Sequence, residues 1–271
     1  MSRVVFVSGL LLLVLVTAGC GFVRATGEIV TETRDVGSFD AVELRGSADV
    51  TIEIGDETSV TVETDSAVID RITTEVVDDR LIIDQQDGRF LGVDRVHVAV
   101  TMPSVTGIGL DGSGTITADE LVDPLTASLA GSGDIDLGGA VDRIDLVLDG
   151  SGSIDAVDLT ARSATVGGGG SGDVTVMVDG SDLTVSVDGS LNITAAGVVD
   201  AATVAIDGSG RIAARDLTAG TAMVRVYGSG SVELSVVDAL DVSITGSGDV
   251  VYRGDPEVSR DVTGSGGVHR G

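Results

Sequence analysis

The sequence predicts an all-β protein that winds into a single-stranded parallel β-helix, a solenoid with about 19 residues in each rung. Three observations support this fold class. A Gly-Ser dipeptide recurs at a nearly constant interval, the positions around it alternate between apolar and polar, and helical spacing is not sustained anywhere. Strands that recur in this way stack in register only if the chain winds round and returns one strand spacing higher. We expect a right-handed coil, since right-handed crossovers are the rule.

The N-terminus resembles a bacterial lipoprotein signal. A short positive start is followed by an apolar run over residues 4–16 and by "TAGC", which ends at Cys20, the only cysteine. The run is too short to span a bilayer comfortably and ends in small residues, as signal peptides do. This resemblance implies a signal peptide over residues 1–19 and a diacylglyceryl anchor on Cys20, which would hold the protein on the extracytoplasmic face of the bacterial membrane. A buried structural cysteine is the alternative.

The segment between the cysteine and the repeats divides into two parts. Residues 20–36 are mostly polar and predict a lipid-anchored tether. Residues 37–110 contain alternating stretches such as "FDAVELRGSADVTIEIGD", "RLIID" and "RVHVAVTMP", which predict strands with less regular spacing. We expect these strands to begin the coil and to cover its N-terminal edge, because open strand edges promote aggregation. The "GSAD" at Gly46 is an outlying copy of the repeated dipeptide.

Residues 111–271 hold the regular repeats. The first glycines of the repeated dipeptide are Gly112, Gly131, Gly150, Gly170, Gly189, Gly208, Gly228, Gly246 and Gly264. The residues four positions after them are all β-branched: Ile116, Ile135, Ile154, Val174, Ile193, Ile212, Val232, Val250 and Val268. Such a pattern predicts strands with one buried face. The glycines mark a corner of each rung, because glycine adopts the positive φ angles of a sharp bend without steric cost.

One corner departs from the pattern. Two positions before each corner the residue is apolar except in "VGGGGSGD", where Gly168 occupies this position between Leu148 and Val187 of the neighbouring rungs. The space left by the missing side chain could stay open, or the backbone could bulge and approach the neighbouring rung with Gly168 at positive φ. We favour the bulge, since this rung has 20 residues and its four consecutive glycines exceed what a vacancy requires.

Composition limits the partners. The chain has 43 acidic and 16 basic residues, all of the latter arginine, for a net charge of −27. A field of this sign repels nucleic acid and anionic headgroups. It favours a solvated, self-repelling surface, with attraction of cations or basic partners as the alternative. Aromatic residues are 2% of the chain and tryptophan is absent, so we expect a core of valine, isoleucine, leucine and alanine.

The charge pattern near the corners predicts no metal site. The residue before the corner and the residue three after it are never both aspartate in one rung, which indicates that like charges are kept apart in the stack. A calcium ladder would concentrate carboxylates instead, and the nonapeptide pattern fails even in "GGGGSGD", where Ser171 replaces the required glycine. We therefore expect no metal and no cofactor.

Candidate catalytic chemistry is sparse. His97 falls in an alternating strand and His269 in the tail, and neither is paired in sequence with a nucleophile or a ligand. The tripeptide Arg253-Gly254-Asp255 resembles an integrin-binding signal, but in a chain this rich in glycine and aspartate we interpret it as a chance turn before Pro256. We expect no catalytic residues.

Several stretches together resemble one bacterial family. "SFDAVELRGSADVTIEIGD", "RLIID", "VTMPSVTGIGLDGSG", the serial Gly-Ser-Gly corners and "YRGDPEV" are similar to the head GIN domain, catalogued as a "putative autotransporter adhesin", over residues 38–268. The resemblance implies an exported protein, often a lipoprotein, that folds as a parallel β-helix. It brings no agreed catalytic residues.

Two functions remain open. The first is a non-catalytic, lipid-anchored surface module that binds a protein, a glycan or the envelope. The second is an envelope hydrolase or lyase that acts on a polysaccharide. A cleft with two or more convergent carboxylates of raised pKa would favour the enzyme, whereas a smooth prism with evenly spread acidic residues would favour the module.

Overall fold

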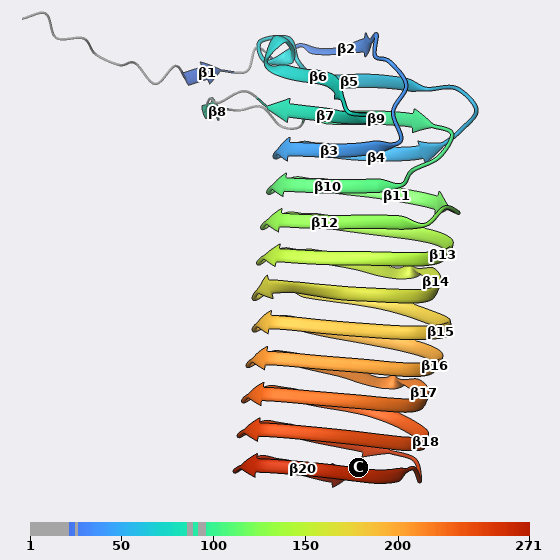
Figure 1. Cartoon of the computed structure of the whole chain (residues 1–271). Coiled ribbons are helices and arrows are strands. Elements are labelled where there is room, and N and C mark those ends of the chain that lie inside the picture. The colour runs from blue at the N-terminus through green and yellow to red at the C-terminus, as the bar shows by residue number, and fades with distance from the viewer. Residues whose placement is uncertain (1–21, 25–26, 86–88, 92–95) are drawn as a thin grey trace, which may run out of the picture.

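The computed structural model describes residues 22–24, 27–85, 89–91 and 96–271, and it shows the predicted parallel β-solenoid (Figure 1). The expected signal peptide over residues 1–19 and Cys20 lie outside the described residues. Within the described ranges, no helix has the length and apolar character needed to cross a membrane. The one short helical turn, η1, is a 3-10 helix over Ile69–Arg71.

The main stack begins with three short strands, β10 (Gly107–Gly112), β11 (Thr115–Leu121) and β12 (Leu125–Gly131). Below them, each strand runs from one corner to the next. These strands are β13 (Asp134–Gly150), β14 (Ser153–Gly170), β15 (Asp173–Gly189), β16 (Asn192–Gly208), β17 (Arg211–Gly228) and β18 (Ser231–Gly246). The stack ends with β19 (Asp249–Arg253), β20 (Glu257–Gly264) and β21 (Gly267–Arg270). All of these pairings are parallel.

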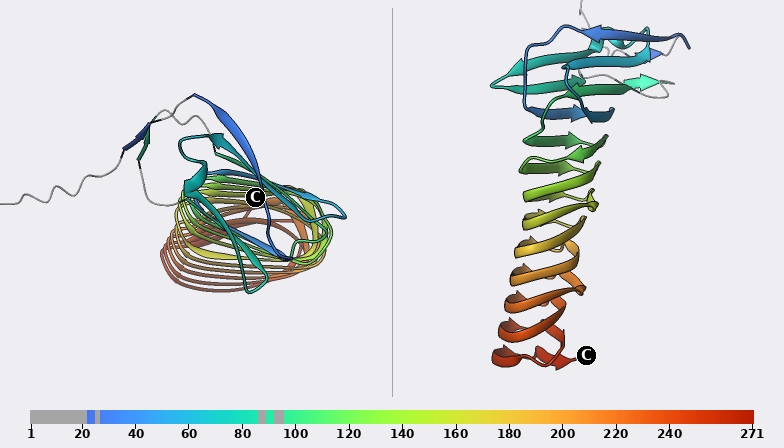
Figure 2. Two further views of the ribbon diagram at one scale, coloured as in Figure 1. Left: turned by 90° about the horizontal axis from the view of Figure 1, so that it is seen from above. Right: turned by 90° about the vertical axis from the view of Figure 1, so that its right-hand side faces the viewer.

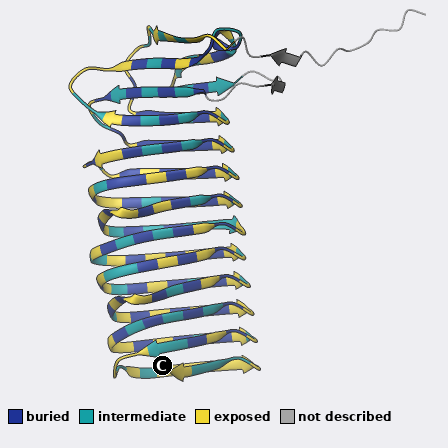
Figure 3. Cartoon of the chain, turned by 180° about the vertical axis from the view of Figure 1, so that it is seen from behind, coloured by how far each residue is buried: buried dark blue, intermediate teal, exposed yellow. Residues whose placement is uncertain are grey.

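The register places equivalent residues of successive rungs above one another, in what we call columns. Ile154 pairs with Ile135 above and Val174 below, and it is 1% exposed, as predicted. Buried and exposed residues alternate along each strand, which Figure 3 shows as repeated stripes. The core is built almost entirely of valine, isoleucine, leucine and alanine, with Phe39 and Met102 as buried exceptions. The outline of the rungs superposes when the stack is seen from above (Figure 2).

The corners need glycine for two reasons. Most of their first glycines have positive φ, as Gly131 does at +127°, which confirms the predicted bend. The rungs also approach closely here, because a Cβ at Gly131 would lie 2.2 Å from the carbonyl oxygen of Gly112. The same oxygen accepts a hydrogen bond from the backbone N–H of Ser132 at 2.8 Å. The ladder of backbone hydrogen bonds therefore continues through the corner.

Gly168 has φ +140°, and a Cβ there would lie 2.1 Å from the carbonyl oxygen of Leu148. The predicted close backbone approach at positive φ is confirmed, but the predicted bulge at Gly168 is wrong, because β13 and β14 stay in register at this corner. The extra residue of this 20-residue rung lies elsewhere, however. The register between β13 and β14 shifts at Asp136/Gly138, and the partner strand bulges near Val157. The rung that ends at Gly228 shifts at the same bend, between Thr194 and Ala196 of its partner. Bends outside the corners accommodate the insertion because fewer columns constrain them.

The first rung is separated from the second by a long excursion of the chain. Strands β3 (Ala41–Gly46) and β4 (Asp49–Ile54) pair in parallel with β10 and β11, and Gly46 aligns with Gly112. The outlying dipeptide at Gly46 is therefore a true corner. The chain then leaves the stack and returns as β7 (Arg80–Gln85) and β9 (His97–Met102), which pair with β3 and β4 from the other side.

Antiparallel strands close the N-terminal end, where they lie across the stack (Figure 2, right). Strand β5 (Ser59–Asp65) pairs with β9, β6 (Ile72–Val77) pairs with β7, and β2 (Ile29–Arg34) pairs with β5. The expected tether over residues 20–36 is therefore wrong for Ile29–Arg34. Alternate residues of this strand pack against the cap, and the antiparallel pairing supplies the hydrogen bonds that a tether would leave to water.

Side chains complete the cap. The buried Asp65 carboxylate accepts hydrogen bonds from the backbone N–H groups of Gly27 at 2.7 Å and Ala67 at 2.8 Å. Above the first corner, Gln85 Oε1 accepts from the N–H and the hydroxyl of Ser47, at 3.2 and 3.0 Å. This oxygen replaces the glycine carbonyl that serves the other corners. Strands β1 (Phe22–Arg24) and β8 (Arg89–Leu91) form a separate parallel pair.

Candidate functional site

The outer surface of the stack carries mostly small side chains. One outward column on the strands before the corner runs Ser128, Val147, Gly167, Ser186, Ala205, Arg225 and Ser243. Short side chains on a regular parallel sheet leave a flat face, so hollows form only where a column is interrupted or where two columns diverge.

One hollow, which we call the trough, has a volume of about 460 Å³ and crosses β16, β17, β18 and β20. Its walls are two outward columns, and its floor is the inward column between them. One wall is Ala201, Thr221, Ala239 and Glu257, the other is Thr203, Met223, Asp241 and Ser259, and the floor is Ala202, Ala222, Leu240 and Val258. Ala202, Ala222 and Leu240 are buried, so the floor of the trough is strand backbone, and two carboxylates lie at its C-terminal end.

A second hollow of about 230 Å³ lies where the first rungs meet the cap. Glu43 and Arg80 border it, with an Arg80 Nε–Glu43 Oε2 distance of 3.7 Å, and Arg45 pairs with the same carboxylate at 2.7 Å. Its base includes Gly109 and Ser128. Asp111 and Asp149 also line this hollow, so its rim carries more carboxylates than guanidinium groups.

The third hollow is acidic and holds about 150 Å³ between Asp119, Asp136, Asp155 and Asp158. Partial burial raises the pKa of Asp136 above its usual range, and the neighbouring carboxylates of Asp155, Asp134 and Asp119 raise it further.

The acidic hollow corrects one prediction from the sequence. Like charges do stack in neighbouring rungs, since Asp136 pairs directly with Asp155. The prediction compared positions within a rung, whereas repulsion acts between rungs about 4.8 Å apart. Three residues after the corner, acids do alternate with donors. Ser153 donates a hydrogen bond to Asp134, and Asn192 Nδ2 donates to Asp173 Oδ1 at 3.0 Å.

The two histidines lie apart, and the Arg-Gly-Asp tripeptide lies near only one of them, His269. His97 is in β9 of the cap, and His269 is in β21 of the last rung, at the opposite end of the stack (Figure 1). His269 Nε2 lies 3.8 Å from Asp249 Oδ1. Gly254 has φ +102° in the bend between β19 and β20, and Asp255 pairs with Arg270 at 3.2 Å. The tripeptide is an exposed turn, as one interpretation predicted.

Metal-ligating side chains are not gathered anywhere in the described part of the chain, where no group of three or more His, Cys, Asp or Glu residues has the arrangement to hold an ion. Cys20, the single site residue that the sequence predicts, lies outside the described residues. The trough was not predicted from the sequence. The residues that form its two walls stand seven and five positions before each corner, and their columns could have indicated it.

These features define the class of the protein: an acidic parallel β-solenoid rod with a capped N-terminal end and shallow surface hollows. Residues 38–181 and 169–256 match the model of the family described as "Putative auto-transporter adhesin, head GIN domain". The chain belongs to this family, as its sequence resemblance indicated. None of the curated proteins compared with the chain matches it.

Solved structures share the fold. A "putative lipid binding protein" from Parabacteroides distasonis is 24% identical with a TM-score of 0.72, and the match covers 93% of this chain and 100% of that one. A "putative adhesin" from the same organism is 20% identical with a TM-score of 0.70, over 93% and 100% of the two chains. A "putative adhesin" from Parabacteroides merdae is 18% identical with a TM-score of 0.67, over 92% and 99%.

Proposed function

We propose that the protein is a non-catalytic, adhesin-like binding module that is exported and held at the bacterial cell envelope by a lipid on Cys20. The observation that carries the proposal is a rod of stacked rungs whose outer face, over the described residues, offers shallow hollows. Membership of the adhesin family supports the same role. The partner is a protein or a glycan, and nucleic acid is disfavoured by the charge of −27.

The anchor is tested by fractionation. Cys20→Ala removes the only thiol that could accept a lipid, so the variant should remain unprocessed or be released from the membrane. Wild-type protein should partition into the detergent phase after cloud-point extraction. Equal partitioning of wild type and variant as mature chains would contradict a lipid anchor on Cys20.

The binding role is tested by capture. The fragment from Gly21 onward, coupled to beads, should retain a specific component from envelope extracts. The same fragment with Ile154→Asp, which disrupts the core, serves as the matched control. Retention that is identical for the two fragments would show that the folded rod does not recognise the component.

A polysaccharide hydrolase or lyase is the second candidate, and the raised pKa of Asp136 in the acidic hollow is the observation that favours it. Its test is release of reducing ends from envelope polysaccharides. We expect no release above the level of the Asp136→Asn variant. Release that Asp136→Asn abolishes would establish the enzyme and overturn the non-catalytic proposal.

A further inference from the structure

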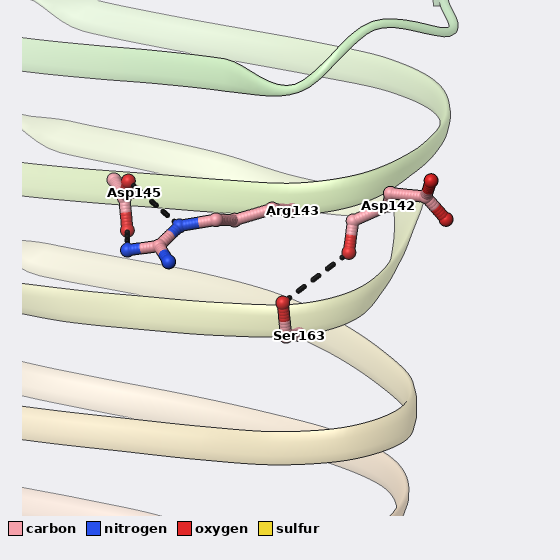
Figure 4. A network of polar contacts seen from close by, with 4 residues as sticks. All are labelled: Asp142, Arg143, Asp145 and Ser163. Atoms are coloured by element: carbon pink, nitrogen blue, oxygen red, sulfur yellow. Dashed lines mark hydrogen bonds and ion pairs between the residues drawn. The ribbon is translucent and has the colours of Figure 1, made fainter.

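Higher in the stack, one arginine side chain lies in the same column as a wall of the trough. Arg143 and Asp145 of β13 are two residues apart and point to the same outward side of the strand. The guanidinium of Arg143 donates two hydrogen bonds to the Asp145 carboxylate, from Nε at 3.1 Å and from Nη2 at 3.0 Å. Figure 4 shows the arginine extended along the rung toward Asp145. This bidentate geometry is the strongest that a guanidinium and a carboxylate can form.

The two partners of this pair stand in the same columns as the walls of the trough. The column of Arg143 continues through Ser163, Asp182, Ala201 and Thr221 to Ala239. The column of Asp145 continues through Thr165, Thr184, Thr203 and Met223 to Asp241. Ala239 and Asp241 are therefore the register equivalents of Arg143 and Asp145. Strand β18 thus has a carboxylate at the position of Asp145 and an alanine at the position of Arg143.

This replacement leaves a carboxylate beside an open space. Asp241 is exposed, and among the described residues its carboxylate makes no ion pair and no hydrogen bond. Ala239 lacks the side chain that would cover the floor at Leu240, which adds to the volume of about 460 Å³. A second carboxylate, Glu257, lies one rung below Ala239 in the same wall. The site has the shape and charge that an arginine side chain would complement.

We propose that the trough binds an arginine side chain from an exposed segment of another protein, with its guanidinium on Asp241 and its aliphatic stem across the strand backbone beside Ala239. This inference rests on the proposed binding role and narrows its partner to a protein. The partner is not a second copy of this chain, because two rods of net charge −27 repel each other. Arginine is favoured over lysine because only the planar guanidinium can form both hydrogen bonds to one carboxylate.

The test uses the full chain in detergent with its methionine methyl groups isotopically labelled for NMR. Met223 lines the trough, whereas Met102 is fully buried in the first rungs and reports on the fold. The probe is the peptide Ala-Ala-Arg-Ala-Ala with blocked termini. Its control has citrulline in place of arginine, which keeps the shape and removes the charge. We expect the arginine peptide to shift the Met223 resonance in a saturable manner and the citrulline peptide to bind at least about fivefold more weakly.

Three variants locate the interaction. Asp241→Asn should raise the Kd of the arginine peptide by about fivefold, the range for a partly exposed charge-assisted pair. Asp207→Asn, an exposed aspartate outside the trough, should leave the Kd unchanged. Ala239→Arg should pair internally with Asp241, as Arg143 does with Asp145, and so abolish peptide binding while the Met102 resonance stays in place.

The proposal is overturned if Met223 does not respond to the peptide, if citrulline and arginine peptides bind equally, or if Asp241→Asn and Asp207→Asn have equal effects. Such a failure is distinguishable from failure of the binding role itself. Capture of an envelope component by the rod does not depend on Asp241, so a rod that still retains a partner would keep its binding function at another surface.

Discussion

At the scale of single residues, Gly168 shows how closely the rungs approach. Its positive φ and the 2.1 Å separation between an added Cβ and the Leu148 oxygen exclude a branched side chain. We expect Gly168→Val to lower the free energy of unfolding by about 2 kcal/mol, because strain and a backbone clash are introduced together. Chemical denaturation measures the change.

The adjacent Gly167 supplies the matched control. A Cβ there would meet only the carbonyl oxygen of Ser186 at 3.4 Å, an ordinary contact, and its φ is not in the left-handed region. Gly167→Ala should therefore change the unfolding free energy by less than about 0.5 kcal/mol. A stabilising effect of Gly168→Val would show that the position is a vacancy and that its backbone can relax.

Ile154 and Asp155 are neighbours with opposite environments, since the first is 1% exposed and the second lies on the outer face. Ile154→Asp buries an unpaired carboxylate and should cost about 4 kcal/mol or more. Asp155→Asn should cost less than about 0.5 kcal/mol, because the side chain is exposed and faces Asp136. Urea midpoints of the two variants check the prediction, and equal midpoints would contradict the register.

Asp136 makes stability depend on pH in a definite direction. Because its pKa is raised in the folded state, the folded protein holds the proton more tightly than the unfolded chain. Ionisation of Asp136 therefore lowers the free energy of unfolding at pH values above its raised pKa. This reduction disappears as the pH falls to the ordinary aspartate range. We expect Asp136→Asn to stabilise the protein by about 0.5 kcal/mol at neutral pH, a small value because the group is partly solvated.

The gain from Asp136→Asn should vanish below about pH 3, where the native carboxyl group is protonated in both states. Denaturation midpoints across the pH range measure this. Asp182→Asn is the control, since Asp182 is exposed and pairs with Ser163 and Ala201 in the neighbouring rungs. A gain that persists unchanged at acid pH would show that charge repulsion at Asp136 is not its cause.

Residue-scale features were predictable from the sequence where they follow the repeat. The buried column through Ile154 and the corner glycines follow from fixed offsets within each rung. The contact of Asp136 with Asp155 was not predicted, although both residues stand five positions after their corners and pair before the register shifts. The prediction considered only the positions one before and three after each corner.

At the scale of strands, the register between β15 and β16 can be tested by cross-linking. Thr184 and Thr203 are paired, exposed residues on neighbouring strands, so their Cα atoms are about 4.8 Å apart and within disulfide range. In a Cys20→Ala background, Thr184→Cys with Thr203→Cys should lose both free thiols on mild oxidation. Thr184→Cys with Asp207→Cys should keep them, because Asp207 lies four residues farther along.

Oxidation of the Thr184→Cys/Asp207→Cys pair and not of the Thr184→Cys/Thr203→Cys pair would contradict the register.

Strand order could be predicted from the sequence only within the regular repeats. The first rung pairs with β10 across a gap of more than 50 residues, and β7 and β9 insert beyond it. These parallel pairings join segments at irregular separations along the chain, which leaves no periodic signal. The short strand Ile29–Arg34 was missed for the same reason.

At the scale of the whole molecule, the protein is a stiff acidic rod with one closed end. The antiparallel strands cover the N-terminal edge of the solenoid, and the net charge of −27 keeps copies of the rod apart. An anchor at Cys20 would tie the capped end to the membrane and leave the trough, near the other end, directed away from it (Figure 1).

The trough could have been found in the sequence by extending the columns farther from each corner. Arg143 and Asp145 stand seven and five positions before Gly150, and Ala239 and Asp241 stand at the same offsets before Gly246. The hollow itself could not be predicted, since its volume depends on how far the two columns diverge around the floor residues. Packing, and not periodicity, determines that distance.

We propose above that one lipid-modified end fixes the rod to the envelope, and mass spectrometry of the N-terminus tests this proposal most directly. Protein extracted from membranes should begin at Cys20, lack residues 1–19, and carry a diacylglyceryl thioether on the cysteine sulfur. An N-terminus that retains residues 1–19, or a mature chain whose Cys20 thiol is free, would contradict the claim.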